Sequence, residues 1–392
     1  MTNPRHALVL SPEAPYPVIG GGALRTASVV EYLRRRYAVH VITCREPGAP
    51  DPRPFFPPDV RVDVIDLPYH SKSTAARAAR NLSRFVRGVP PLIDRFHGFV
   101  SEIEAIERSQ RTHYEVGVIE HFWAAHYAPV LRPICRRLVL NLHNVESVLL
   151  DRCADAEASS FQRLIFRRWA ASCRRLEAAA YPLFDTLLVT SEEDARLLPG
   201  NPVVYPNAIP LVGEKKTERS QRSIVFSGNL AYQPNVTAVR WFAREVWPGL
   251  KKRLPELTWR LVGRNDAAVR PIVAGLEGVS LTGPVPDALE AIAESAVSIA
   301  PILSGSGTRI KIIEAFAAGV PVVSTPIGAE GLPVTDGVHL LLASDAGDFE
   351  AAIVKVLQTP GLSDQLSAAG RRLYEQKLTW EAVWSILNRI DL

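Results

Sequence analysis

The chain has 392 residues, of which 47% are apolar and 22% charged, which is typical of a globular protein and excludes disordered and fibrous classes. One hydrophobic core rarely serves so long a chain, so we expect two domains. The net charge of +4 favours anionic ligands but is too small to indicate a nucleic-acid-binding protein.

The sequence contains no signal for export or membrane insertion. The N-terminal residues lead directly into an apolar segment at residues 7–10, and no apolar run approaches the roughly 20 residues of a membrane span. The cysteines are far apart and form no Cys-x-x-Cys pair, as expected for reduced thiols; they are Cys44, Cys135, Cys153 and Cys173. We therefore expect a cytoplasmic protein.

The first 43 residues predict a strand, glycine loop, helix and strand unit. Strand 7–10 is followed by a Pro- and Gly-rich loop, helix 23–36 and strand 39–43. The dinucleotide-binding fingerprint is incomplete, because Arg25 holds the position of its third glycine. Gly21 and Gly22 therefore mark either a plain turn or a place where the backbone approaches a ligand.

A basic segment follows a predicted strand at residues 61–67. Residues 70–87 contain no acid, and their arginines recur at spacings of three and four, which places them on one helix face; they are Arg77, Arg80, Arg84 and Arg87. This face is either a solvated surface or a patch for anionic lipid or a charged acceptor.

Polar residues follow two further predicted strands. Strand 116–119 leads to Glu120 and His121, and strand 138–142 leads directly to His143 and Asn144, with Glu146 two residues further on. Parallel α/β sheets bind ligands at the carboxyl ends of their strands, so these residues are candidates for a site. The alternative for His143 is a residue near a helix N-cap, and for His121 both interpretations stay open.

The rest of the first half continues the alternation of helices and strands. We expect a long helical stretch at 151–181, strands at 186–191 and 203–205, and a polar linker at 209–222.

In the second half, strand 223–227 ends in Gly228 and Asn229, and a strand at 279–281 leads to Gly283 and Pro284. Between and after these strands we expect a helix at 236–254, a strand at 258–262 and a helix at 289–295. The alternation in both halves predicts two doubly wound α/β domains.

A loop of small residues follows the apolar strand 297–303 and precedes a helix at 308–318. The loop consists of Ser304, Gly305, Ser306, Gly307 and Thr308. Backbone N–H groups and the positive end of the helix dipole make such a loop a phosphate site.

Arg309 and Lys311 lie in the first turn of this predicted helix. A cation there loses roughly 0.3–1 kcal/mol to the helix dipole. One interpretation is that both are solvated surface residues with no net effect on stability. The other is that they clamp a bound diphosphate, whose negative charge would turn the unfavourable interaction with the helix dipole into a favourable one. Glu314, one turn further on, can accept hydrogen bonds from a ribose.

The string Gly-Thr-Arg-x-Lys-x-x-Glu-Ala at residues 307–315, with Val-Val-Ser-Thr and Gly-Ala-Glu-Gly-Leu after it, resembles the donor-site signature of retaining GT-B glycosyltransferases of family four (glycosyl transferases group 1). Most members have a Glu where this chain has Ser306. The resemblance implies a GT-B fold with two Rossmann-like domains facing each other across a cleft. Residues 1–208 would form the acceptor domain, 209–222 the linker and 223–378 the donor domain, with a helix at 379–392 crossing back onto the first domain.

The resemblance also implies roles for individual residues. Gly21 and Gly22 would approach the donor diphosphate, His143 would be the active-site histidine, and Gly283 with Pro284 would form the base-binding turn. His121 and Asn144 would lie on the acceptor side.

Many members carry an Arg and a Lys at and after the turn that is Gly228-Asn229 here. Neither is present, so Arg309 and Lys311 are expected to hold the diphosphate instead. The sequence has no Asp-x-Asp, so we expect no metal and no cofactor.

The function expected from this resemblance is retaining transfer of a sugar from a nucleoside diphosphate sugar, with UDP or GDP as the nucleotide, to a hydroxyl acceptor. Bacterial polysaccharide, glycolipid or other glycoconjugate synthesis would use such a reaction, with a lipid-linked glycan as one acceptor and peripheral contact with the inner membrane face. The alternatives are a nucleotide-sugar epimerase of the same architecture and a non-catalytic nucleotide-sugar-binding subunit.

Overall fold

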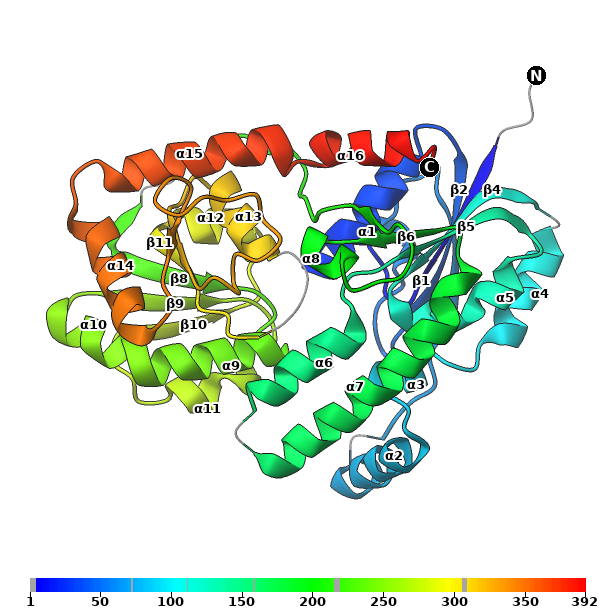
Figure 1. Ribbon diagram of the computed structural model, residues 1–392, viewed down its shortest axis with the longest axis horizontal. Helices are drawn as coiled ribbons and strands as arrows, with labels where there is room; N and C mark the ends of the chain where they lie inside the picture. Colours follow the sequence, from blue (N-terminus) through cyan, green and yellow to red (C-terminus); the bar gives the residue numbers. More distant parts are fainter. Residues whose placement is uncertain (1–4, 72, 111, 158, 215–218, 305–308) are drawn as a thin grey trace. The chain divides into compact units, whose positions relative to one another are not determined.

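The computed structural model describes residues 5–71, 73–110, 112–157, 159–214, 219–304 and 309–392. The chain divides into two compact units (Figure 1), Met1–Pro206 with Ile386–Leu392, and Asn207–Ser385. Each unit is built on one parallel β-sheet flanked by helices.

The first sheet has the strand order β3-β2-β1-β4-β5-β6-β7, with every pair parallel. Its strands are β1 (His6–Ser11), β2 (Ala38–Arg45), β3 (Arg61–Asp66), β4 (Tyr114–Glu120), β5 (Cys135–Asn141), β6 (Thr186–Val189) and β7 (Val203–Val204). The central strands are apolar runs buried on both faces, as a parallel sheet covered by helices requires. The strand order reverses between β1 and β4, which makes the carboxyl ends of these strands the topological switch point.

The helices of the first unit are α1 (Gly21–Leu33), α2 (Thr74–Arg87), α3 (Pro91–Arg95), α4 (Val100–Gln110), α5 (Ala128–Leu131), α6 (Glu146–Asp155), α7 (Ser160–Ala180) and α8 (Glu192–Ala195), with 3₁₀ turns η1 (Arg53–Phe55), η2 (Phe122–Tyr127) and η3 (Tyr181–Leu183). The helical stretch predicted at 151–181 is divided between two helices, α6 and α7. Ser159 begins the second one by accepting a hydrogen bond from the Gln162 N–H, which is an N-cap.

The second sheet has the order β10-β9-β8-β11-β12-β13 and is also parallel. Its strands are β8 (Ser220–Ser227), β9 (Thr258–Val262), β10 (Val279–Gly283), β11 (Ser295–Ala300), β12 (Val322–Ser324) and β13 (Leu341–Leu342). Its switch point lies between β8 and β11. The core against this sheet is rich in aromatic side chains, among them Trp247, Trp259, Phe242 and Phe349.

The helices of the second unit are α9 (Gln233–Trp241), α10 (Trp247–Arg253), α11 (Arg270–Val273), α12 (Ala288–Ala293), α13 (Ile310–Ala317), α14 (Ala346–Gln358) and α15 (Leu362–Lys377), with the turn η5 (Asp266–Ala268). The helix predicted over 236–254 begins earlier and is interrupted by the π-helical segment η4 (Phe242–Val246). Pro248, which has no N–H to donate, follows this segment and weakens regular α-helical bonding there.

The predicted linker at 209–222 is too long at its C-terminal end, because β8 already begins at Ser220. Its first residue is also part of ordered structure. Ile209 donates its N–H to the carbonyl of Leu378 (3.1 Å) and accepts from the Trp380 N–H (3.1 Å).

The last helix, α16 (Trp380–Arg389), contributes its C-terminal residues to the first unit. Asn388 accepts a hydrogen bond from the Tyr32 hydroxyl (2.9 Å), and Arg137 donates to the carbonyls of Ile390 (2.9 Å) and Asp391 (2.8 Å). A search of the described helices finds none with the length and apolar character to cross a bilayer.

The ends of β8 and β9 approach each other so closely that a side chain at Gly263 has no room. Gly263 has φ +145°, and a Cβ there would lie 1.8 Å from the carbonyl oxygen of Gly228. Gly263→Ala should therefore lower the free energy of unfolding of the second unit by about 3 kcal/mol.

Denaturant unfolding checks this prediction, with Gly213→Ala as the control because nothing lies within 4 Å of a Cβ at Gly213. Equal unfolding midpoints for the two variants would show that the β8–β9 end tolerates a methyl group.

Candidate functional site

A buried carboxylate at the end of β4 organises the switch point of the first sheet. Glu120 is fully buried, and its Oε2 lies 2.8 Å from Nε2 of His143. The Asn141 Nδ2 donates to both carboxyl oxygens (2.9 and 3.1 Å), and the Thr26 hydroxyl donates to Oε2 (3.1 Å). The predicted site histidine is thus held by the carboxylate of Glu120, which the sequence placed at a strand end without a role of its own.

Arg25 completes this network from α1. Its Nε donates to Oδ1 of Asn141 (2.9 Å) and its Nη1 to the carbonyl of Tyr205 (2.5 Å), while its guanidinium lies 4.9 Å from the centre of the Tyr205 ring. The Asn141 amide therefore bridges a buried cation and the buried carboxylate of Glu120. The arginine that interrupts the dinucleotide fingerprint is part of this network.

Burial sets the protonation of these groups. It raises the pKa of Glu120, while hydrogen bonding from Asn141 and the charge of Arg25 lower it. It also holds the pKa of His143 well below its usual value, and Arg25 acts in the same direction. At neutral pH His143 is therefore an uncharged imidazole.

His121 lies beside His143, as predicted for a second polar residue at this edge. Its ring stacks between His143 (centroids 3.5 Å apart) and Trp123 (4.2 Å). Its backbone φ of 62° is rare for a residue with a side chain and stores strain of order 1–3 kcal/mol. Its Nδ1 is buried without a hydrogen-bond partner among the described residues, and burial holds its pKa well below the usual value.

The residues after His143 support the far side of this stack. Glu146 accepts a hydrogen bond from the Trp123 indole N–H (3.0 Å), and the side chain of Asn144 also bonds to Glu146. Burial raises the pKa of Glu146 to about 7. Asn144, predicted on the acceptor side, thus contacts the glutamate that holds Trp123.

Gly22 of the predicted glycine pair lies against both imidazoles. Helix α1 begins at Gly21 without a side-chain cap. A Cβ on Gly22 would lie 3.7 Å from Nε2 of His121 and 3.8 Å from Nδ1 of His143. The N-terminal N–H groups of α1 are therefore next to the two histidines.

In the second unit, Lys311 reaches from α13 to the turn after β8. Its Nζ donates to Oδ1 of Asn235 (2.8 Å) and lies 3.7 Å from the centre of the Phe226 ring. A Cβ on Gly228 would lie 3.5 Å from this ammonium. The Gly228-Asn229 turn has no cationic side chain of its own, and Lys311 of α13 places its amino group beside it.

Arg309 is buried and is the N-cap residue of α13, since the helix begins at Ile310 rather than at residue 308 as predicted. Burial, with Arg309 nearby, lowers the pKa of Lys311 to about 7. Burial also raises the pKa of Glu314 to about 7, against the opposing effect of Lys311. Ser304 is buried after β11, whereas the predicted donor residues Gly305, Ser306, Gly307 and Thr308 lie outside the described residues.

The other predicted donor residues lie at the carboxyl ends of neighbouring strands. Asn229 accepts hydrogen bonds from the Asn265 side chain (2.9 Å) and from the Ala231 N–H (3.2 Å). Gly283 accepts from the Gly263 N–H (3.2 Å) at the end of β10, and Pro284 follows it on the surface.

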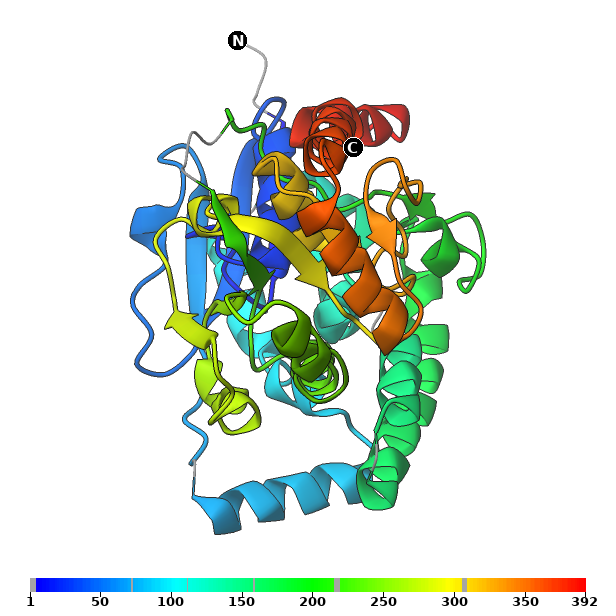
Figure 2. The ribbon, with the colours of Figure 1, turned by 90° about the vertical axis from the view of Figure 1, so that its left-hand side faces the viewer.

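The helix α2 is exposed along its whole length, and its arginine face is less uniformly basic than predicted. In both views it extends from the body of its unit (Figures 1 and 2), and none of its residues is buried. The prediction of an acid-free face is wrong for the folded protein. Residues 70–87 contain no acid, but Asp94 of the neighbouring helix α3 pairs with Arg84 (2.8 Å) and Arg87 (2.8 Å). Arg77 and Arg80 remain clear of that pair.

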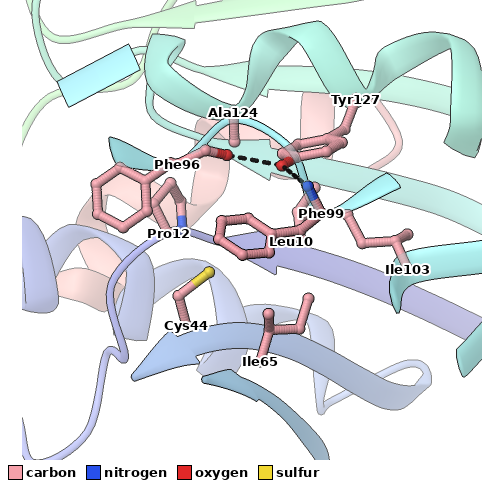
Figure 3. A pocket seen from close by; sticks show the side chains of 9 residues that line it. All are labelled: Leu10, Pro12, Cys44, Ile65, Phe96, Phe99, Ile103, Ala124 and Tyr127. Carbon is pink, nitrogen blue, oxygen red and sulfur yellow. Dashed lines mark hydrogen bonds between the residues drawn. The ribbon is translucent and has the colours of Figure 1, made fainter. Parts of the chain in front are cut away.

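A small apolar hollow in the first unit has too little room for a ligand (Figure 3). Apolar side chains such as Leu10 and Ile65 line it, and it leaves only about 10 Å³ for the centre of a water molecule. The Tyr127 hydroxyl donates to the carbonyl of Phe96 (2.7 Å) and accepts from the Phe99 N–H (3.1 Å). The space holds at most about one water, so it is a packing defect.

The burial of Lys311 makes stability depend on pH. Between about pH 7 and 10.5 the unfolded chain keeps a proton on Lys311 that the folded chain has lost. The free energy of unfolding should therefore rise with pH across this range. Lys311→Met should be more stable than the parent at pH 7, and the difference should shrink towards pH 10.5.

Denaturant unfolding at several pH values measures this effect. Lys252→Met, at an exposed position on α10, is the matched control and should not change the slope. A Lys311→Met difference that stays constant with pH would contradict the burial of a titrating amine.

Comparison with known proteins agrees with this architecture. Residues 221–359 match the family described as Glycosyl transferases group 1. Sucrose-phosphate synthase from Thermosynechococcus elongatus superposes with a TM-score of 0.71 at 18% identity, covering 99% of this chain and 98% of that one. HepE from Anabaena, in complex with UDP and glucose, gives 0.66 at 15% identity, covering 98% and 99%.

A phosphatidyl-myo-inositol mannosyltransferase from Mycobacterium leprae is 31% identical over 149 residues, which are 36% of this chain and 40% of the relative. The matches span only 40–58% of the curated relatives. The predicted fold class is confirmed: the chain has two doubly wound parallel-sheet domains of the GT-B fold, and its similarity to the glycosyl transferases group 1 family lies in residues 221–359.

Proposed function

We propose that this protein is a retaining glycosyltransferase that moves a sugar from a nucleoside diphosphate sugar to a hydroxyl acceptor. The observation that carries the proposal is Lys311, whose ammonium reaches the Gly228 turn at the switch point of the group 1 domain. Doubly wound sheets bind their ligands at this position. The UDP and glucose named for the Anabaena structure support this donor class, and the mannosyltransferase match supports sugar transfer.

Departure of a nucleoside diphosphate requires compensation of the negative charge that develops on it. Arg309 and Lys311 supply two positive groups on α13, and both are already desolvated, so their attraction for phosphate oxygens is weakly screened. A bound diphosphate would favour the charged form of Lys311. The reaction would then need no metal ion, in keeping with the absence of Asp-x-Asp from the sequence.

The other residues have separate parts in the proposal. Glu314, next to this cation pair, would bind the donor ribose. His143, an uncharged imidazole at the switch point of the first sheet, would contact the donor sugar. Retention would follow from attack on the face of the leaving diphosphate, since the sequence contains no evident carboxylate nucleophile. The pathway would be bacterial glycoconjugate synthesis.

Titration calorimetry with UDP, GDP and their nucleosides tests the clamp. Arg309→Ala should weaken binding of the nucleoside diphosphate by about 2–5 kcal/mol and leave nucleoside binding almost unchanged, because only the phosphates lose a cation. In the parent, diphosphate binding near pH 8 should take up protons as Lys311 becomes charged, which appears as a dependence of the heat on the buffer.

Arg244→Ala, which removes an exposed arginine of the second unit, is the control and should bind both ligands normally. Equal losses for nucleoside and diphosphate in Arg309→Ala would rule out the clamp. Failure of the parent to bind or turn over any of the UDP-, GDP- and TDP-sugars would overturn the proposed function, and the anomeric configuration of the product tests retention.

We also propose that the protein contacts an anionic membrane through α2, with a lipid-linked acceptor there. Leu82 and Val86 are 64% and 68% exposed on a helix that also carries Arg77 and Arg80. Arg168 donates to the carbonyl of Phe85 (2.8 Å), which attaches the C-terminal turn of α2 to α7. A helix with exposed apolar and cationic groups is suited to the bilayer interface.

Sedimentation with vesicles measures this contact. The parent should sediment with vesicles containing phosphatidylserine, less so at high salt, and Arg77→Glu/Arg80→Glu should reduce the bound fraction. Arg108→Glu/Arg136→Glu changes the net charge equally at exposed sites elsewhere in the unit. Equal loss in both double variants would point to net charge rather than to α2.

A further inference from the structure

We propose that Glu120 is a positioning residue that holds the His143 ring in one orientation with its proton on Nε2. The inference rests on the proposed transferase function for its consequence in catalysis, and on the geometry of the first unit alone for the hydrogen bond. Glu120 does not act on substrate in this proposal; it acts through His143.

The surroundings of the Glu120 carboxyl group decide which partner carries the proton. Asn141 Nδ2 donates to both oxygens, and the Thr26 hydroxyl donates to the oxygen that His143 contacts. A carboxylate accepts from all of these groups, whereas a carboxylic acid would need to place an O–H among donors. Burial raises the pKa of Glu120, and these hydrogen bonds and the positive charge of Arg25 oppose that rise.

The carboxylate therefore accepts from His143, and the shared proton lies on Nε2. In the neutral ring the lone pair is then on Nδ1. That nitrogen is the one 3.8 Å from the position of a Cβ on Gly22, at the start of α1. Glu120 thus determines which ring atom faces the N-terminal end of this helix.

Stacking cannot make this choice alone. The His121 ring limits tilting of His143, and it is itself backed by Trp123 and Glu146. A ring rotated by 180° would stack equally well, however, and would exchange the places of its nitrogens. Only a hydrogen bond such as the one to Glu120 distinguishes the two orientations.

The titratable groups that face His143 come from two elements. Glu120 is the last residue of β4, His121 follows that strand directly, and Arg25 lies on α1. Of these, Arg25 and His121 oppose a positive charge on His143, and Glu120 is the acidic group in contact with it. Replacing Glu120 removes the partner of Nε2 while the other two remain.

The chain contains a matched control pair. His40 is also buried, and its Nε2 lies 2.8 Å from Oδ2 of Asp63, while its Nδ1 bonds to the Tyr114 hydroxyl (2.7 Å). This pair lies on β2 and β3, away from the switch point. Asp63→Asn therefore reports the general effect of breaking a bond between a buried histidine and a half-buried carboxylate.

The first readout is long-range ¹H–¹⁵N NMR of histidine-labelled protein, which needs no substrate. His143→Gln identifies the His143 signals. In the parent these signals should show one neutral tautomer with the proton on Nε2, and in Glu120→Gln a mixture or the opposite tautomer. Asp63→Asn should leave the His143 signals unchanged.

The second readout is steady-state kinetics with the UDP-, GDP- or TDP-sugar that the parent turns over. Glu120→Gln should lower kcat by about 10- to 100-fold and change KM by less than about threefold, because the ring is misplaced while donor binding is retained. Asp63→Asn should keep the parent kcat.

Glu120→Asp is measured alongside, because it keeps the charge but withdraws the carboxylate from His143 by one methylene group. If Glu120→Gln does not fold, the same readouts on Glu120→Asp decide the proposal, with partial loss of the Nε2–H form expected. An unchanged His143 tautomer in the folded variants overturns it, as does an unchanged kcat. If the parent turns over no sugar nucleotide, the proposed transferase function is refuted. The NMR comparison still tests whether Glu120 determines the tautomer of His143.

Discussion

The constraint on which this structure depends is that a parallel sheet must be buried on both faces. Apolar strands such as β1, β4 and β11 have little exposed surface for polar chemistry. Functional groups can therefore collect only where strands end. In both sheets the strand order reverses once near the middle, and connections leave in opposite directions there, so each sheet leaves one place open for a ligand.

Both places contain charges that have been removed from water. In the first unit, Glu120 and Arg25 are buried together, and the amide of Asn141 accepts from one and donates to the other. Breaking such a network by removing one member leaves the others without compensation, which is costly in a medium of low polarity. The network thus makes the position of His143 rigid.

The second unit uses burial differently. Lys311 has an aromatic ring and an amide oxygen as close neighbours, and its pKa falls to about 7. A group in that state has lost hydration and gains much from an anion, so burial prepares it for a ligand. The same desolvation that weakens the unliganded fold at neutral pH is what would strengthen diphosphate binding.

The sequence by itself determined the alternation of strands and helices, the division into two α/β domains and the strand ends at which polar residues collect, because these follow from local periodicity and turn chemistry. It also indicated His143, His121, Lys311 and Arg309. It did not reveal the network of Glu120, Asn141 and Arg25 around His143, the pairing of Asp94 with two arginines of α2, or the division of the helical stretch at 151–181 into α6 and α7. Only the tertiary structure decided these, since they are contacts between segments distant in sequence, and periodicity along the chain carries no record of which segments meet.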